Sequence, residues 1–295
     1  MYKHQTFDLF IYTQSEIEHL IGKPVRKMQL LREWPLSSVH EIECTDGSLW
    51  IAKYMREPLN IEGDFYSQVQ GSFVLPCNHI INHPPHLTLV YEKVQGVHPN
   101  QLNLTESEAL GLLNKVQSQI RTLNHLNLPV RITIDTPDTF VSRFEETISH
   151  LKQLINSGKF TRCNQTTWQI VEQIISDHDI VQKLTENVGY AHGDLGADNI
   201  LCLPDETFLI MDWQRSIRGS YLIDQYIFME SMGLNPLHYL PIEAFYLANL
   251  ERIDWYVSTS VRWFPSATMR YDEFIYPLAE KLISVYPAKT TKLRV

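Results

Sequence analysis

Residues Ala191 to Leu201 read A-H-G-D-L-G-A-D-N-I-L, and this stretch is the most informative part of the sequence. It sets an aspartate at position 194 and an asparagine at 199 ahead of an apolar run typical of a strand. A second apolar run, Phe208 to Met211, leads directly into Asp212. Short strands bordered by oxygen-bearing side chains predict that Asp194, Asn199 and Asp212 meet at one loop cluster.

This set of side chains is typical of phosphoryl transfer. Moving a γ-phosphoryl group requires divalent ions that neutralise the phosphate oxygens and a group that orients and deprotonates the attacking hydroxyl. Mg²⁺ prefers carboxylate and amide oxygens, so Asn199 and Asp212 are candidate metal ligands and Asp194 is the candidate base. The sequence holds neither a Walker A motif nor a dinucleotide-binding fingerprint, which disfavours the two commoner nucleotide-binding folds.

The segment resembles the catalytic region of the aminoglycoside phosphotransferase and choline kinase superfamily, the small-molecule relatives of protein kinases. Gly193 follows the histidine where protein kinases usually have arginine, Asp212-Trp213-Gln214 replaces D-F-G, and no A-P-E follows. The resemblance implies that Asp194 is the catalytic base, that His192 braces its loop, and that Asn199 and Asp212 bind magnesium. It also implies ATP as the phosphoryl donor.

An earlier stretch, Trp50 to Lys53, resembles the lysine-bearing strand of kinases. On a strand Lys53 shares an apolar face with Ile51, so its ammonium needs a partner, and the phosphates of ATP are a natural one. Glu62, at the start of a predicted helix, is a candidate to hold the lysine by an ion pair. Glu57 and Asp64 compete for that role.

The remaining nucleotide contacts are less distinctive. No G-x-G-x-x-G loop occurs, but the main-chain N–H groups of Ser37 and Ser38, in a turn predicted over 34–38, are candidates to cradle phosphates. An ordinary hairpin turn is the alternative. The strand before Gln95-Gly96 resembles the family hinge, which implies adenine contacts near Glu92 and Val94. Ile210 is a candidate floor for the adenine, or a plain core residue.

The pattern along the chain predicts an α+β, protein-kinase-like fold of two lobes. Residues 1–94 form a small β-rich N-lobe that binds the nucleotide phosphates, and residues 95–295 form a mainly helical C-lobe with the catalytic loop and the acceptor site. Strands are predicted at 28–33, 39–44, 49–54, 87–94, 199–203 and 208–211. Helices are predicted at 61–69, 105–126, 140–155, 166–186, 221–230, 241–258 and 271–285.

Composition limits the partners. The chain of 295 residues carries a net charge of −9, which disfavours nucleic acid and anionic membranes as partners. Its four cysteines include no C-x-x-C pair, and Met1 to Thr6 lack the apolar region of a signal peptide, so we expect a cytoplasmic protein. The sequence leaves the oligomeric state open.

The acceptor is expected to be a small molecule with a hydroxyl group, such as an amino alcohol, a sugar or an antibiotic. Residues 213–295, which build much of the acceptor pocket in the family that the chain resembles, carry nine basic and eight acidic residues. This balance weakens the case for a polycationic aminoglycoside. The alternative function is a non-catalytic nucleotide-binding regulatory module on the same fold, although every expected catalytic residue type is present.

Overall fold

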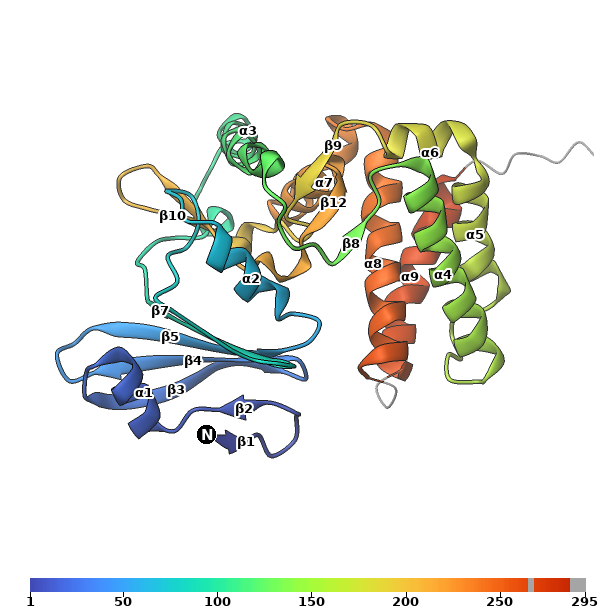
Figure 1. The fold of residues 1–295 in the computed structure, drawn as a ribbon. Coiled ribbons are helices and arrows are strands. Elements are labelled where there is room, and N and C mark those ends of the chain that lie inside the picture. Colours follow the sequence, from blue (N-terminus) through green and yellow to red (C-terminus); the bar gives the residue numbers. More distant parts are fainter. Residues whose placement is uncertain (265–267, 287–295) are drawn as a thin grey trace, which may run out of the picture. The chain divides into compact units, whose positions relative to one another are not determined.

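The first ninety residues are organised around an antiparallel sheet. The computed structural model describes residues 1–264 and 268–286. Its five-stranded sheet has the order β3-β4-β5-β7-β6, and four of these strands, β3, β4, β5 and β7, are labelled in Figure 1. The Asp46-Gly47 pair turns the chain between the second and third of these strands, with Gly47 at φ 83°. The strands are β3 (Val25–Trp34), β4 (Ser37–Cys44), β5 (Leu49–Arg56), β6 (His79–His83) and β7 (His86–Glu92).

The register of the sheet separates its two faces. Lys53 of β5 lies opposite Val39 of β4 and Leu89 of β7, whereas Ala52 lies opposite His40 and Val90. Because successive side chains of a strand point to opposite faces, Lys53 and Ala52 define different faces. The Lys53 face carries the candidate site, and the Ala52 face carries the hydrophobic core of this sheet.

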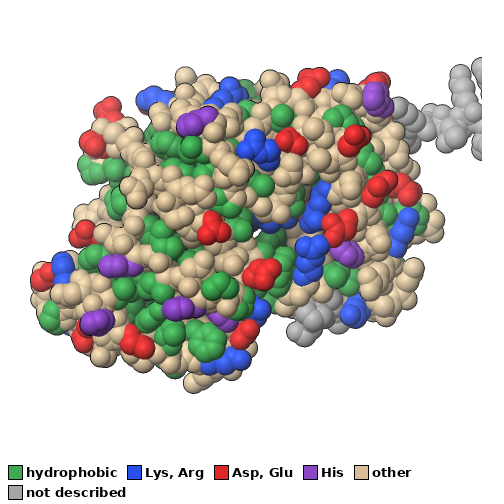
Figure 2. Space-filling model, in the orientation of Figure 1, with side chains coloured by type: hydrophobic (Ala, Val, Ile, Leu, Met, Phe, Trp, Pro, Cys, Tyr) green, Lys and Arg blue, Asp and Glu red, His purple; other side chains and the backbone are tan. Residues whose placement is uncertain are grey.

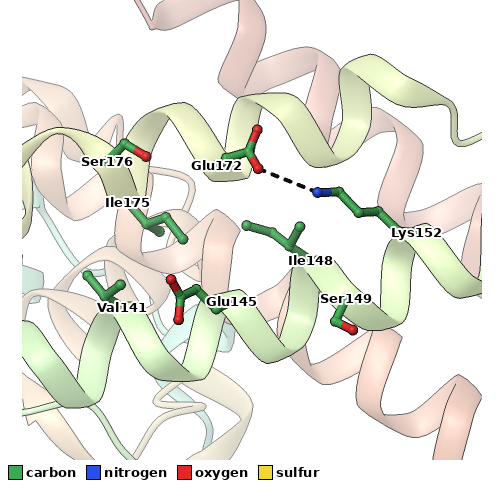
Figure 3. A pocket seen from close by; sticks show the side chains of 8 residues that line it. All are labelled: Val141, Glu145, Ile148, Ser149, Lys152, Glu172, Ile175 and Ser176. Carbon is green, nitrogen blue, oxygen red and sulfur yellow. Dashed lines mark hydrogen bonds and ion pairs between the residues drawn. The ribbon is translucent and has the colours of Figure 1, made fainter.

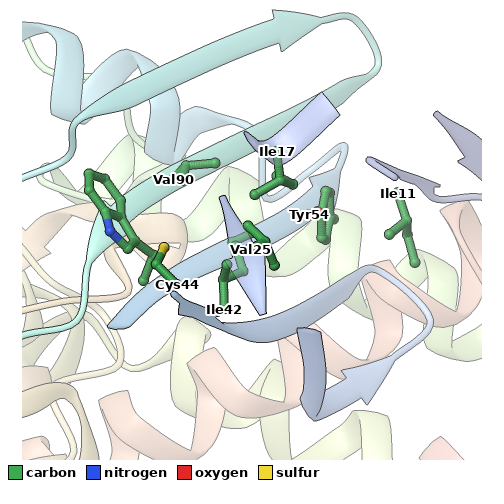
Figure 4. Close-up of a cluster of buried hydrophobic side chains, with 9 residues drawn as sticks. Ile11, Ile17, Val25, Ile42, Cys44, Tyr54 and Val90 are labelled. Atoms are coloured by element: carbon green, nitrogen blue, oxygen red, sulfur yellow. The ribbon is translucent and has the colours of Figure 1, made fainter. Parts of the chain in front are cut away.

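That core is closed by the N-terminal segment. Helix α1 (Gln14–Ile21) and the short strands β1 (Tyr2–Lys3) and β2 (Phe10–Ile11) precede the sheet, and Ile11 and Ile17 belong to the buried cluster that Figure 4 shows. The remaining members come from the sheet: Val25, Ile42, Cys44, Trp50, Ala52, Tyr54 and Val90. Sequence analysis predicts mostly strands here and misses α1, whose signal is the capping box between Thr13 and Glu16.

Helix α2 (Ile61–Gln68) packs closely on the Lys53 face. A Cβ at Gly63 would lie 2.7 Å from Cδ1 of Leu87, so a larger residue at this position would require the Leu87 side chain to move. Phe65, on the same helix, has no exposed surface. The packing fixes α2 against the sheet and thereby places Glu62, which is 1% exposed, next to β5.

The segment around Asp212 folds with the N-terminal sheet into one compact unit, made of Met1–Ile132 and His192–Ile217. Val74 pairs with Ile210, and Val97 pairs with Cys202, so two stretches of the first hundred residues bind the later hairpin directly. The elements of this unit beyond the sheet are η1 (Pro99–Gln101), α3 (Glu106–Arg121), η2 (Thr122–His125), η3 (Ala197–Asn199), β10 (Ile200–Cys202), β11 (Phe208–Ile210) and η4 (Trp213–Arg215).

The second compact unit, Thr133–Ala191 and Arg218–Val295, is mainly helical. Arg143 binds the fully buried Asp254 at 2.8 Å and so ties α4 to α8. Its helices are α4 (Pro137–Asn156), α5 (Gln165–Ser176), α6 (His178–Leu184), α7 (Leu222–Ser231), η5 (Pro236–His238), α8 (Ile242–Arg262) and α9 (Thr268–Val285). Three short strands, β8 (Ile132–Thr133), β12 (Ile217–Ser220) and β9 (Val188–Ala191), form a further sheet in that order.

One helix prediction is wrong in this unit. The single helix expected over 166–186 is two helices, α5 and α6, separated at Asp177. Asp177 leaves the helical conformation at ψ 99°, and its side chain accepts a hydrogen bond from the main chain of Ile180. Asp177 is therefore both the C-cap of α5 and the N-cap of α6. An aspartate that caps a new helix favours ending the previous helix over continuing it.

The division into units differs from the two predicted lobes, 1–94 and 95–295, because part of the later chain folds with the sheet. The lobes concern function, and they stay a prediction. Within the described ranges, 1–264 and 268–286, no helix has the length and apolar character that crossing a membrane requires.

Candidate active site

The centre of the candidate site is an ammonium group held between two carboxylates. Lys53 Nζ lies 2.6 Å from Oε2 of Glu62 and 2.5 Å from Oδ1 of Asp212. The side chains of Lys53 and Glu62 are 4% and 1% exposed, whereas that of Asp212 is 28% exposed. The sequence separation of 159 residues between Lys53 and Asp212 makes this a long-range contact that the fold itself creates.

The environment sets the charges of the three groups. Burial opposes the charged form of Lys53, but Asp212 and Glu62 outweigh burial and raise the pKa of the ammonium above its ordinary value. Burial also works against the Asp212 carboxylate, but the charge and hydrogen bond of Lys53 hold its pKa below the usual range. For Glu62 burial dominates and raises the pKa to about 7. Lys53 therefore stays charged between the two carboxylates, and Glu62 is the carboxylate of this cluster whose pKa lies nearest to neutral pH.

The structure selects one of the three acidic candidates beside Lys53. Glu62 forms the ion pair, and both Glu57 and Asp64 are exposed. The main-chain N–H of Trp213 also donates to Glu62, which links α2 to the residue after Asp212. The fully buried Trp213 ring stacks on Phe65 of α2 with 4.3 Å between ring centroids. The helix, the lysine strand and the Asp212 segment thus hold one another in place.

His192 braces the loop from inside. The ring is fully buried, with Nε2 2.8 Å from the main-chain oxygen of Met211 and Nδ1 3.3 Å from the main-chain nitrogen of Asp194. A carbonyl can only accept and an amide N–H can only donate, so Nε2 carries the proton and Nδ1 accepts. The histidine therefore joins the Asp194 loop to the residue before Asp212.

Asp194 is the most exposed acidic group of the cluster. Its carboxylate is 37% exposed and lies 3.1 Å from Nη1 of Arg215. Gly193 adopts φ 77°, and a Cβ there would lie 2.2 Å from the main-chain oxygen of Arg215. Glycine is therefore required before Asp194, because any side chain would push the loop away from η4. Sequence analysis did not single out Arg215.

One hydrogen bond orients the side chain of Asn199. Its Nδ2 donates to the main-chain oxygen of Asp194 at 2.7 Å, which turns Oδ1 the other way. Among residues 1–264 and 268–286, neither Oδ1 of Asn199 nor Oδ2 of Asp212 has a hydrogen-bond partner. Two oxygen donors of the kind that Mg²⁺ prefers are thus left available, and the residues fit this ion.

The described part of the chain contains no group of three or more His, Cys, Asp or Glu side chains that could hold a metal alone. This agrees with the usual form of magnesium sites in phosphoryl transfer, where one or two protein ligands share the ion with substrate phosphates. The backbone of Asp212 is itself strained, with φ 62° and ψ 49°, a left-handed conformation that is uncommon outside glycine. Such strain persists where the surroundings fix a functional side chain.

The structure does not bring Ser37 and Ser38 to this cluster as predicted. The turn is confined to Pro35 and Leu36, so both serines lie inside β4, between β3 and β5. Their side chains are 4% and 0% exposed, and the main chain of a central strand bonds to its neighbours. The Ser37 hydroxyl accepts from Nε1 of Trp34. We therefore leave both serines out of the proposed phosphate contacts.

The hinge segment has an available donor. Glu92 ends β7 and Val94 follows it, and the N–H of Val94 makes no hydrogen bond among the residues that the structure describes. Ile210 is fully buried, whereas Met211, one residue nearer to Asp212, keeps exposed surface. Met211 is therefore the better candidate for contact with a base, because it keeps exposed surface directly after the end of β11.

A pocket of about 650 Å³ lies elsewhere, between α4 and α5 of the second unit. Figure 3 shows Glu145 and Ile148 of α4 facing Ile175 of α5, with Lys152 bound to Glu172 across the opening. None of the residues from the catalytic motif lines it. We do not assign this pocket to the candidate active site.

The fold is that of the aminoglycoside phosphotransferases. It matches a thermostable mutant of aminoglycoside phosphotransferase APH(4)-Ia, in complex with ADP and hygromycin B, with a TM-score of 0.60 and 10% identity over 92% of this chain and 98% of that one. Spectinomycin phosphotransferase APH(9)-Ia, in complex with ADP and spectinomycin, matches with a TM-score of 0.54 and 14% identity over 93% and 99%.

The streptomycin–ATP complex of APH(2'')-IIa matches with a TM-score of 0.56 and 14% identity, over 93% of this chain and 97% of that one. No family model and no curated protein matches the sequence. The predicted α+β, protein-kinase-like fold is confirmed, and the resemblance stated from the sequence motifs agrees with these neighbours.

Proposed function

We propose that the protein transfers the γ-phosphoryl group of ATP to a hydroxyl of a small molecule. The observation that carries this proposal is the contact of Lys53 with both Glu62 and Asp212, next to a loop that presents Asp194 and Asn199. The structural neighbours bind ADP or ATP, which supports a nucleotide as the donor. A likeness of fold alone would not suffice, because one fold hosts many functions.

Each residue then has one role. Lys53 binds the α- and β-phosphates and is held for this by Glu62. Asn199 and Asp212 hold Mg²⁺, which when bound neutralises the charge on the phosphate oxygens. Asp194 orients the acceptor hydroxyl and takes its proton as the new bond from oxygen to phosphorus forms and the bond to ADP breaks. Arg215 keeps the Asp194 carboxylate in position.

The base of the nucleotide would lie along the hinge. Val94 donates its main-chain N–H to the adenine ring, and the Glu92 main chain accepts from the amino group. Val39 and Ile51 share the Lys53 face of the sheet, as the register shows, and would cover one side of the ring. Met211 would contact the opposite side.

The distribution of charged side chains does little to distinguish between the possible classes of acceptor. The neighbours act on or bind the antibiotics hygromycin B, spectinomycin and streptomycin. In this chain acidic and basic side chains are interspersed over the face drawn in Figure 2. Trp255 and Tyr256 lie on α8, where Trp255 is 6% exposed and serves helix packing. We propose a hydroxyl-bearing small molecule as the acceptor: an amino alcohol, a sugar or an antibiotic.

The test is a coupled assay of ADP release, run with panels of those three acceptor classes and with wild-type protein, Asp194→Asn and Asp198→Asn. Asp198 is the matched control, because it is exposed on the same loop and lies outside the proposed roles. We expect acceptor-dependent ADP release that Asp194→Asn lowers by about 10²–10⁴-fold, the usual contribution of general base catalysis. Nucleotide binding without turnover by any variant would favour the regulatory module instead.

A further inference from the structure

Arg32, on the edge strand β3, is a cation without a protein partner. It is exposed, and it forms no hydrogen bond or ion pair with any residue in 1–264 or 268–286. Its neighbours on the strand differ: Arg26 binds Glu43 at 3.0 Å, and Lys27 donates to Gln29 at 2.9 Å. The proposed roles described so far do not use Arg32.

The register places Arg32 in line with the active lysine. Arg32 lies opposite Val39, and Val39 lies opposite Lys53. Residues that are paired across neighbouring strands point to the same face, so Arg32 and Lys53 share one face, two strands apart. Two strand spacings amount to about 10 Å, which a long arginine side chain and a triphosphate together can span.

An irregularity in β3 produces this alignment. The pairing shifts between Leu30 and Arg32, so Leu31 is an extra residue in the ladder. Leu30 pairs with His40 and points to the opposite face. In a regular strand the next residue, Leu31, would pair with Val39, but the shift gives that position to Arg32. Bulges commonly redirect side chains in this manner near functional sites.

The hairpin between β3 and β4 supplies few groups that could bind phosphate, and Arg32 is a candidate to bind it instead. Its turn, Pro35 and Leu36, has no glycine, and Leu36 is 1% exposed. Ser37 and Ser38 are enclosed in the sheet, so the hairpin tip offers little that could bind phosphate. Arginine is well suited to this task, because its planar guanidinium binds phosphate oxygens through two parallel hydrogen bonds.

We propose that Arg32 binds the terminal phosphates of the nucleotide, in place of a glycine-rich loop. This inference rests on the proposed function, since it requires a triphosphate at Lys53. It adds a second cation, besides Lys53, to the proposed phosphate site. Arg32 is a binding residue in this account, and Asp194 remains the base.

The test compares nucleotides with and without phosphates. Binding of Mg-ATP and of adenosine is measured by calorimetry for wild-type protein, Arg32→Gln, Arg32→Lys and the control Lys27→Gln. Lys27 is a matched control, because it lies on the same strand and face but opposite Glu43, away from Lys53. We expect Arg32→Gln to weaken Mg-ATP binding about tenfold or more, the usual effect of losing a charge-assisted pair.

The other variants, and adenosine as a ligand, test whether the loss of affinity is specific to Arg32 and to the phosphates. Arg32→Lys should recover part of the lost affinity for Mg-ATP, Lys27→Gln should match the wild type, and adenosine should bind all variants alike. Equal Mg-ATP affinity in Arg32→Gln and wild type, or an equal loss for adenosine, would overturn the role of Arg32 alone. A wild-type protein that binds no Mg-ATP would overturn the proposed function together with this inference.

Discussion

Glu62 shows how one buried side chain can make stability depend on pH. Its pKa rises from an ordinary 4.5 to about 7 because burial outweighs the attraction of Lys53. Between these values the folded protein keeps a proton that the unfolded chain has lost. The contribution of Glu62 to stability is therefore complete below pH 4.5 and is lost as the pH rises toward 7.

We expect the free energy of unfolding of wild-type protein to fall by on the order of 3 kcal/mol more than that of Glu62→Gln between about pH 5 and pH 7.5. The measurement is urea unfolding at several pH values. Glu57→Gln removes an exposed carboxylate shortly before α2 and serves as the control, with the wild-type slope. Parallel pH profiles for wild type and Glu62→Gln would contradict the raised pKa.

Substitution of Gly193 should destabilise the protein, because the surroundings leave no room for a side chain there. Gly193 combines φ 77° with a main-chain oxygen 2.2 Å from the place of a Cβ, so Gly193→Ala strains the backbone and displaces the Asp194 loop. We expect a loss of about 2 kcal/mol or more, together with loss of activity. The measurement is thermal unfolding.

The matched control for Gly193→Ala is Gly111→Ala, in the middle of α3, where a Cβ meets open space. That substitution should stabilise the protein by about 0.5–1 kcal/mol, because alanine is the better helix former. If both variants melted at the same temperature, the close approach of Gly193 to Arg215 would be wrong.

At the scale of elements, Asp272 connects the start of α9 to the loop before α5. Its carboxylate accepts hydrogen bonds from the main-chain N–H groups of Thr161, Arg162 and Cys163 at 2.5–2.7 Å. Burial opposes the charge, but these donors hold the pKa of Asp272 below its ordinary value. Its stabilising effect is therefore present at neutral pH and is lost as the pH falls through the lowered pKa.

We expect Asp272→Ala to lower the free energy of unfolding by about 3 kcal/mol or more at neutral pH, because several main-chain donors lose their acceptor. The neighbouring Glu273→Ala should change it by less than about 0.5 kcal/mol, since Glu273 is 57% exposed and lies 3.8 Å from Arg162. Chemical unfolding of both variants makes the comparison. A loss in Asp272→Ala no larger than that in Glu273→Ala would show that the loop does not depend on this carboxylate.

The elements that the sequence predicts best are those with one unambiguous signal. The strand carrying Lys53 and the hairpin at Asp46-Gly47 follow from alternation and turn chemistry. Helix α1 escapes prediction because it has only eight residues, of which Ile17 alone is buried, so its apolar stripe is short. The break at Asp177 was missed because apolar spacing continues through it, and only the cap at Ile180 reveals the new helix.

For the candidate site, spacing predicts residue types but not partners. The sequence identifies Lys53 and Asp212 and favours Glu62, but it leaves Glu57 and Asp64 as competitors. The packing of α2 on the sheet decides which of the three carboxylates lies beside Lys53. The sequence does not identify Arg215 and Arg32 as site residues either, because tertiary structure determines where their side chains lie. Their positions depend on a loop approach and on an extra residue in β3, and neither leaves a periodic pattern.

At the scale of the whole molecule, the fold agrees with kinase-like antibiotic phosphotransferases at 10–14% identity. So low an identity means that packing patterns persist where individual residues do not, and the function rests on the site residues themselves. The cytoplasmic location, the absence of nucleic-acid and membrane partners, and the boundary of the lobes near residue 94 stay predictions. We propose that the group transferred at this site is a phosphoryl group and that it goes to a hydroxyl.

The most direct test of that claim follows the phosphorus atom itself. Wild-type protein is incubated with Mg-ATP and an acceptor from the ADP-release assay, and the products are read by ³¹P NMR. We predict one new phosphomonoester resonance that grows in step with ADP and does not form with Asp194→Asn. Equal amounts of ADP and inorganic phosphate, with no phosphomonoester, would contradict the account.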